Sequence, residues 1–162
     1  MKQQSPEEIV NFRDISDQYN IYLVDLWGVI HNGVKLFDNA IYVLKKLKNE
    51  NKKVVLISNA PRTNETVKKF LLKLNFELNL IDLLITSGDV TRNYILKNSN
   101  KKFYHLGPSK DNDLFYDIKN ITKNVHDSDE VVCTGLIDKI GQDISNYHSL
   151  FIELINKEKV FI

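Results

Sequence analysis

Residue types that suit phosphate chemistry follow two apolar runs of this sequence. The run over residues 21–24 ends at Asp25, and the run over residues 53–57 ends in Ser58 and Asn59. An aspartate can act as a nucleophile or a metal ligand, whereas a hydroxyl and a carboxamide can donate hydrogen bonds to phosphoryl oxygens. The alternative for Asp25 alone is a carboxylate that caps the next helix or pairs with a lysine.

The elements around these residues predict how they are positioned. A helical pattern over residues 38–50 separates the two runs, which gives the order strand, helix, strand. The strands of such a unit are parallel, and ligands bind at the carboxyl ends of parallel strands. We therefore expect Asp25, Ser58 and Asn59 at one edge of one sheet. The first run is apolar throughout and predicts a strand buried on both faces.

The remaining patterns predict further helices and strands in alternation, which is typical of α/β proteins. A polar run over residues 98–102 marks a boundary. We divide the chain into an N-terminal helix (1–19), a core (20–98) and a second α/β unit (99–162). The first predicted helix covers residues 6–19 and starts at Ser5 and Pro6. The other predicted helices cover residues 38–50, a segment that begins at Thr63, and residues 88–98, 111–118 and 145–157. The further strands are predicted over residues 81–85, 102–107, 130–134 and 159–162.

Three motifs in this order resemble one family. Asp25-Leu-Trp-Gly-Val29 and Leu56-Ile-Ser-Asn-Ala-Pro61 are similar to the first two motifs of the haloacid dehalogenase-like (HAD) hydrolases, and Ile85-Thr-Ser-Gly-Asp-Val90 agrees with their class IIA branch. The resemblance implies the fold class α/β: part of a Rossmann-like, parallel, three-layer HAD core, followed by the first half of a large α/β cap domain.

The resemblance also implies a function and a set of site residues. Asp25 is expected to attack a small phosphorylated metabolite and form an aspartyl-phosphate. Mg²⁺ is expected on the Asp25 carboxylate and the backbone carbonyl of Trp27. Phosphate or substrate binding falls to Ser58 and Asn59, with Gly28 and Arg62 as further members. For Arg62 a surface position is the commoner outcome, and we place it ahead of phosphate binding.

The sequence departs from the family pattern at Trp27. The usual motif has a second aspartate there, which protonates the leaving group and later activates water. The backbone carbonyl of Trp27 can still bind Mg²⁺, but the side chain supplies no acid. Efficient hydrolysis of phosphate monoesters is therefore in doubt, and a phosphate-binding module of this fold without catalysis is the alternative.

The later motifs of the family, a lysine and an acidic pair that binds Mg²⁺, have no match after Val90. The chain is thus expected to be the N-terminal half of a longer hydrolase, and an inactive fragment is a further alternative. A partial core would leave an apolar sheet edge open. Self-association, or pairing with a separately encoded C-terminal half, is the expected consequence.

Several other residues have two interpretations. His31 and Asn32 lie in a glycine-bearing flap, where we favour a solvent-facing turn over substrate contact or replacement of the missing acid. Thr86 and Ser87 either cap the next helix or assist phosphate binding. Cys133 follows two valines and is expected to pack as a small buried hydrophobe.

Composition narrows the functional classes. The 162 residues carry a net charge of +1, which argues against general binding to nucleic acid or to a membrane surface. No apolar run approaches the ~18 residues of a transmembrane helix. A single cysteine excludes an internal disulfide and fits a reducing cytoplasm.

Overall fold

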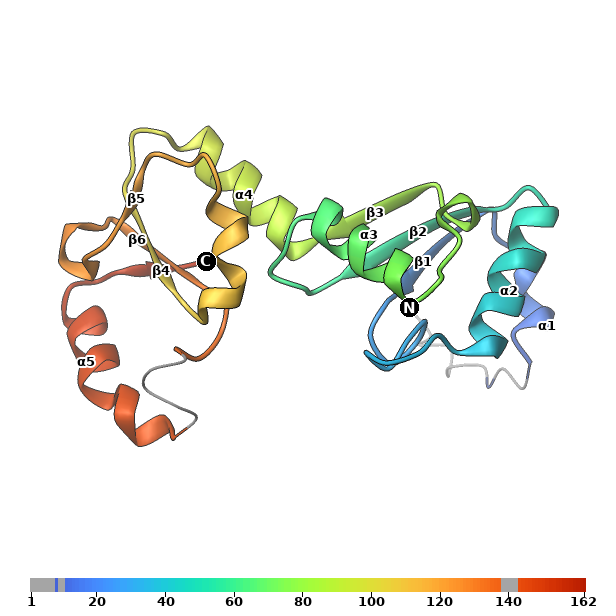
Figure 1. The fold of residues 1–162 in the computed structure, drawn as a ribbon, viewed down its shortest axis with the longest axis horizontal. Helices are drawn as coiled ribbons and strands as arrows, with labels where there is room; N and C mark the ends of the chain where they lie inside the picture. Colours follow the sequence, from blue (N-terminus) through green and yellow to red (C-terminus); the bar gives the residue numbers. More distant parts are fainter. Residues whose placement is uncertain (1–7, 9–10, 138–142) are drawn as a thin grey trace, which may run out of the picture. The chain divides into compact units, whose positions relative to one another are not determined.

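The structure is a computed structural model of the chain, shown in Figure 1. It describes residue 8, residues 11–137 and residues 143–162. The expected start of the first helix, Ser5 and Pro6, lies outside the described residues. Within them the helix is only α1 (Arg13–Ser16), where Ser16 alone is buried. The chain leaves the helix at Asp17, before the expected end at residue 19, since one buried residue gives the helix little tertiary packing.

The first sheet confirms the predicted strand–helix–strand unit. Its strands lie in the order β1 (Ile21–Asp25), β2 (Lys53–Ser58) and β3 (Leu83–Thr86). β1 and β2 are parallel, and Asp25 is paired with Ile57. The connecting helix α2 (Asp38–Asn49) buries Leu44 and Leu47. The ends of β1 and β2 therefore lie at the same edge of this sheet.

β1 is buried on one face only. Tyr22 is 8% exposed, whereas Ile21 and Leu23 are 59% and 67% exposed. Successive side chains of a strand point to opposite faces, so Ile21 and Leu23 mark a face that the described elements leave open. The expectation of a strand buried on both faces is therefore wrong for this part of the chain.

The segment from β2 to β3 contains α3 (Asn64–Lys73) and the 3₁₀ helix η1 (Leu78–Leu80). β3 begins later than predicted because Asp82 binds β2 through its side chain. The Asp82 carboxylate accepts a hydrogen bond from the Val54 N–H at 2.8 Å, and the Asp82 N–H donates to the Val54 carbonyl at 2.8 Å. α4 (Ser87–Lys97) follows β3 directly.

The second sheet has four parallel strands, one more than predicted. Their order is β5 (Ile121–Thr122), β4 (Phe103–Leu106), β6 (Glu130–Cys133) and β7 (Val160–Phe161). β6 is buried on both faces: Val132 joins a cluster with Ile95 of α4, and Val131 joins a cluster with Leu154. The two residues of β5 are too short a run to give a sequence pattern.

The helices around the second sheet are tighter than predicted. The expected helix over 111–118 is a 3₁₀ helix, η2 (Ser109–Phe115), and η3 (Val125–Asp127) precedes β6. The helix expected over 145–157 divides into η4 (Ile144–Tyr147) and α5 (His148–Asn156). The division falls at Tyr147, whose buried hydroxyl accepts a hydrogen bond from the Ile137 N–H at 2.7 Å.

Contacts between residues divide the chain into two compact units. The first contains Met1–Ile57 and Leu72–Leu84, and the second contains Ser58–Leu71 and Ile85–Ile162. Among the described helices, none combines the length and the apolar character that a membrane span requires.

Candidate active site

Asp25 is the last residue of β1 and is exposed. The parallel register pairs it with Ile57, and Ser58 is the next and final residue of β2. The Ser58 side chain is largely buried, and its Oγ accepts a hydrogen bond from the Ala60 N–H at 3.2 Å. Asn59, directly after the strand, is exposed. The predicted residues thus occupy the carboxyl ends of two neighbouring strands.

The segment after Asp25 folds into a tight loop. The Leu26 carbonyl accepts hydrogen bonds from Ile30 at 2.8 Å and from His31 at 3.3 Å, while the Gly28 N–H donates to the His31 carbonyl at 2.8 Å. Gly28 has φ of 82°, a left-handed conformation that favours glycine. The Gly28 N–H is therefore engaged within the loop, and its contribution to a site is the sharp turn that it allows.

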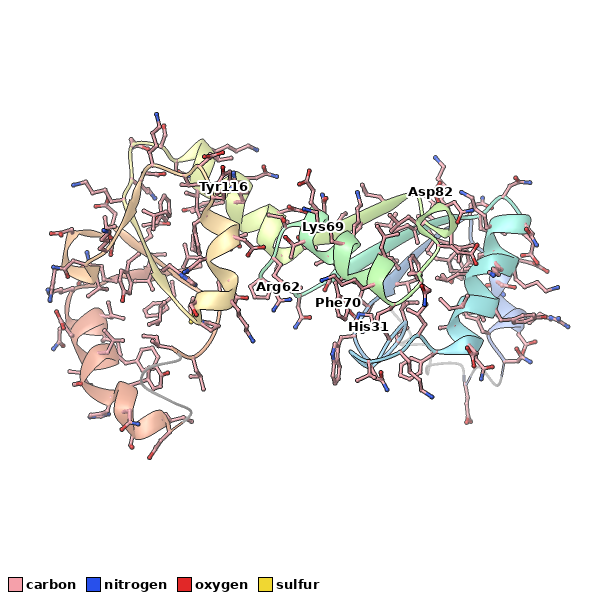
Figure 2. All side chains as sticks on the ribbon, in the orientation of Figure 1. His31, Arg62, Lys69, Phe70, Asp82 and Tyr116 are labelled. Carbon is pink, nitrogen blue, oxygen red and sulfur yellow. The ribbon has the colours of Figure 1, made fainter. Side chains whose placement is uncertain are left out.

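His31 is buried, so the expectation of a solvent-facing turn is wrong for this residue, which is labelled in Figure 2. Its Nδ1 accepts a hydrogen bond from the Gly33 N–H at 3.0 Å; in a neutral ring this assigns the proton to Nε2. Burial lowers the pKa of His31, and the charge of Asp25 opposes that shift. Asn32 is exposed and does form a turn, accepting from Val34 and Lys35 at 3.0 and 2.9 Å.

Trp27 presents an exposed indole at the position of the missing acid. The side chain is 66% exposed, and a β-carbon on Gly33 would lie 3.7 Å from its Nε1. An indole N–H is a donor without useful acidity near neutral pH. The loop therefore offers one carboxylate, Asp25, and a buried histidine whose pKa is lowered by burial.

The loop after β2 is held by the first turn of α4. Ser87 Oγ lies 2.9 Å from the carbonyl oxygens of both Asn59 and Ala60, and the Gly88 N–H donates to the Ala60 carbonyl at 3.1 Å. The Asp89 carboxylate accepts from the Asn64 N–H at 3.0 and 3.2 Å. From the sequence, Thr86 and Ser87 of this turn were expected either to cap the helix or to assist phosphate binding. The turn's support of the loop had no local signal, because the contacts join residues about 25 positions apart.

Thr86 confirms the capping interpretation, whereas Ser87 does not. Thr86 Oγ1 accepts a hydrogen bond from the Asp89 N–H at 3.0 Å, which caps α4. The Ser87 hydroxyl donates instead to the backbone carbonyls of Asn59 and Ala60. The two neighbouring hydroxyls therefore have different structural roles.

Arg62 pairs with a buried carboxylate. Its Nε lies 3.5 Å from Asp111 Oδ1, with side-chain exposures of 37% and 2% respectively. This oxygen has no hydrogen-bond partner among the described residues, so the pair is an ion pair without a well-formed hydrogen bond. Arg62, labelled in Figure 2, is therefore a partly exposed arginine whose side chain forms an ion pair within the protein.

Two oxygen atoms at and just after the end of β1 are the candidate ligands for a divalent metal. The Asp25 carboxylate and the Trp27 carbonyl are oxygen ligands of the kind that Mg²⁺ prefers. Across the described residues there is no group of three or more histidine, cysteine, aspartate or glutamate side chains that could hold a metal ion.

Cys133 is exposed at the end of β6, so its expected burial is wrong.

Comparisons with known proteins identify the family. The sequence pattern of the haloacid dehalogenase-like hydrolases matches residues 22–119, more than half of the chain. A crystal structure of a hydrolase of the haloacid dehalogenase-like family from Brucella suis 1330 is similar over 92% of this chain and 57% of its own, with a TM-score of 0.82 and 29% identity. A search among curated proteins finds no match.

Two more distant structures share the fold. A possible sugar phosphatase of the HAD superfamily from Cytophaga hutchinsonii ATCC 33406 is 20% identical, over 96% of this chain and 57% of its own, with a TM-score of 0.71. A glycerol phosphate phosphatase from Mycobacterium tuberculosis, solved in complex with magnesium, is 16% identical over 86% and 42%, with a TM-score of 0.60.

This chain spans just over half the length of the first two solved relatives, 57% and 56%. The match over residues 22–119 includes all three motifs of the sequence, the whole of β2 with Ser58, and all of β1 except its first residue. The expected α/β fold is confirmed. The chain belongs to the haloacid dehalogenase-like hydrolase family.

Proposed function

We propose that the protein is a phosphohydrolase that acts on a small phosphorylated metabolite, with Asp25 as its nucleophile. The register of β1 with β2 is the observation that supports this most. It pairs Asp25 with Ile57, the residue before Ser58, at the carboxyl ends of parallel strands. A nucleophilic carboxylate beside hydroxyl and carboxamide donors is a combination suited to phosphoryl transfer.

The reaction then has two displacements at phosphorus. A carboxylate oxygen of Asp25 attacks phosphorus, the bond to the ester oxygen breaks, and the alcohol leaves with a proton from solvent. Water next attacks phosphorus, the bond to Asp25 breaks, and inorganic phosphate leaves while the water proton passes to solvent. Ser58 and Asn59 donate hydrogen bonds to the phosphoryl oxygens, and Gly28 shapes the loop that carries the nucleophile.

Mg²⁺ is the proposed cofactor, with the Asp25 carboxylate and the Trp27 carbonyl as ligands. When bound, it neutralises charge on the phosphoryl group. Its remaining ligands would come from protein outside these 162 residues, either a longer chain, a complementing C-terminal half or a second copy. Arg62 is a further phosphate ligand in this proposal, through N–H groups other than the Nε that faces Asp111.

The core over residues 20–98 carries the chemistry in this proposal, and residues 99–162, the first half of the cap, contribute to substrate selection. The single cysteine supports a reducing, cytoplasmic location.

A phosphate-binding module without catalysis is the second candidate. The observation in its favour is Trp27, whose exposed indole stands where the leaving group needs an acid. General acid catalysis contributes about 10²–10⁴ in rate. A protein that lacks it can still bind a phosphorylated ligand through Ser58 and Asn59.

One experiment separates the two candidates. The hydrolysis of 4-nitrophenyl phosphate with Mg²⁺ is measured for the protein, for Asp25→Asn and for the control Asp117→Asn. Asp117 is exposed with φ of 61°, a conformation that asparagine adopts readily. We expect turnover that Asp25→Asn abolishes and the control retains. Inorganic phosphate binding without turnover in any variant supports the module, and turnover retained by Asp25→Asn contradicts the nucleophile.

A further inference from the structure

Asp111 is a carboxylate that the fold buries almost completely. Its side chain is 2% exposed, and its ion pair among the described residues is with Arg62, whose Nε lies 3.5 Å from Oδ1. A buried carboxylate costs free energy unless an opposite charge or hydrogen bonds offset it. Oδ1 has no hydrogen-bond partner in the described part of the chain. Arg62 is therefore the group that compensates the charge at this oxygen.

His105 is also close enough for its charge to interact with Asp111, but its ring is neutral near pH 7. Burial lowers the pKa of His105, and the charge of Asp111 only opposes that shift. A guanidinium, in contrast, stays charged at every pH at which proteins are folded. The permanent positive charge that faces Asp111 is thus the one on Arg62.

The two residues of this ion pair lie on separate elements of the second unit, and each element is held in place by other contacts. Arg62 lies in the loop after β2, where the Ala60 carbonyl accepts hydrogen bonds from the first turn of α4. Asp111 lies in η2, where the Leu114 carbonyl accepts from Arg92 Nη1 at 2.8 Å. The carboxylate is therefore presented to Arg62 from a fixed backbone.

We propose that Asp111 is a positioning residue, which holds the Arg62 guanidinium by its Nε edge so that the Nη edge binds a phosphoryl group. The inference deepens the proposed function and rests on it for the chemistry of the ligand. Both residues of the pair belong to the second unit, and so does the loop that carries Arg62.

The geometry of arginine supports this division of the side chain into two edges. The planar fork of N–H groups binds a carboxylate or a phosphate through two parallel hydrogen bonds. Asp111 faces Nε, and the Nη atoms form no hydrogen bond or ion pair among the described residues. The Arg62 side chain is 37% exposed, so a ligand can reach it. Asn59, three residues earlier in the same loop, is exposed and can add its carboxamide.

The benefit of a fixed guanidinium is a lower cost of binding. A long side chain with many rotamers loses freedom when a ligand orders it, and this loss reduces affinity. A carboxylate that orders the side chain beforehand removes part of that cost. Asp111 therefore increases the affinity for phosphate although it carries a negative charge itself.

Calorimetric titration with inorganic phosphate tests the proposal. Asp111→Asn removes the charge and keeps the shape of the side chain, and water can solvate the partly exposed Arg62 that remains. We expect the Kd of phosphate to rise by about 2- to 10-fold, the cost of ordering one long side chain. Asp113→Asn is the matched control: it removes the same charge from an exposed position of η2 and can still accept from Thr66. It should leave the Kd unchanged.

Arg62→Lys separates positioning from a general structural role. Lysine keeps a positive charge next to Asp111, but an ammonium has no planar fork, so its orientation matters little to a phosphate. Arg62→Lys should itself raise the Kd. Asp111→Asn should then weaken phosphate binding in the arginine protein and have no further effect in the lysine protein.

Three results would overturn the inference. They are equal weakening by Asp111→Asn in the two backgrounds, an unchanged Kd in Asp111→Asn, and no binding of phosphate by the wild-type protein. A lower Kd in Asp111→Asn also overturns it, because the carboxylate would then compete with phosphate for Arg62.

The hydrolysis of 4-nitrophenyl phosphate on the same samples distinguishes this inference from the proposed function. Turnover in a protein whose phosphate Kd does not depend on Asp111 supports the hydrolase and overturns the inference. A Kd that depends on Asp111 only in the arginine background, in a protein without turnover, supports the inference and contradicts the hydrolase.

Discussion

A β-carbon on Gly88 would lie 2.4 Å from the carbonyl oxygen of Arg62. The clash would be with backbone, since the Arg62 carbonyl carbon and nitrogen would each be 2.5 Å away. Backbone cannot move aside as a flexible side chain does. The first turn of α4 and the loop after β2 therefore meet at a distance that only glycine permits, and Asn59 is the first residue of that loop, directly after Ser58.

Gly88→Ala is expected to destabilise the second unit by about 1–3 kcal/mol, the usual cost of overpacking. The free energy of unfolding from urea titration measures this. Val90→Ala, two residues along α4 at an exposed position, is the matched control and should change little. An unchanged unfolding free energy for Gly88→Ala would show that the loop and helix are not in the contact described.

Asp89→Ala removes the carboxylate that accepts from the N–H of Asn64, the first residue of α3. Because an N-terminal cap is worth about 1 kcal/mol, we expect a loss of that size in urea titration. Amide hydrogen exchange should also accelerate in the first turn of α3. Glu65→Ala, an exposed acid in that turn, is the control. Equal effects of the two substitutions would contradict a specific role for Asp89.

Stability should fall on mild acidification because two histidine side chains are held neutral. Burial lowers the pKa of His31 and of His105 from 6.5, so the unfolded chain binds protons more readily than the folded one as pH falls through that value. The stabilisation is present above pH 6.5 and is lost below it. The pKa values of Asp143 and Glu153 are also lowered, from 3.8 and 4.5. The stability that these two carboxylates contribute is therefore lost only in more acidic solution, as the pH falls through those values.

Urea titrations at pH 7.5 and pH 5.5 measure this loss. The Nε2 atom of His105 lies 2.8 Å from Oγ1 of Thr134. His105→Asn keeps a group that can hydrogen-bond this hydroxyl but does not titrate, so this variant should show a smaller difference in stability between the two pH values. His148→Asn, at the exposed start of α5, should behave as the wild type. A difference equal in all three proteins would assign the pH dependence to other groups.

The first sheet was predictable because its signals are local. Apolar runs and a helical repeat between them specify β1, α2 and β2, and the observed bounds agree with the predicted ones to within about a residue. The burial of His31 was not predictable. It results from the fold of its loop, where Gly33 donates to its ring and Leu26 accepts from its backbone.

The support of the site was hidden from sequence for a different reason. Arg62 and Asp111 lie 49 positions apart and approach only because η2 folds next to the loop after β2. The exposure of Ile21 and Leu23 has a similar origin: the run is apolar, but the described elements cover only one face of β1. Local patterns give the elements, whereas such contacts depend on how distant segments pack.

Trp27→Asp tests the missing acid directly. An alkyl alcohol leaves poorly without a proton, whereas 4-nitrophenolate needs none, so the wild-type protein should strongly prefer aryl over alkyl phosphates. An aspartate at this position can donate that proton, and we expect hydrolysis of glycerol 3-phosphate to rise by about 10²–10⁴, with a much smaller change for 4-nitrophenyl phosphate. Trp27→Phe controls for loss of the indole, which is exposed beside Gly33. A protein that hydrolyses the aryl ester but gains nothing on the alkyl ester would show that the proton has another source.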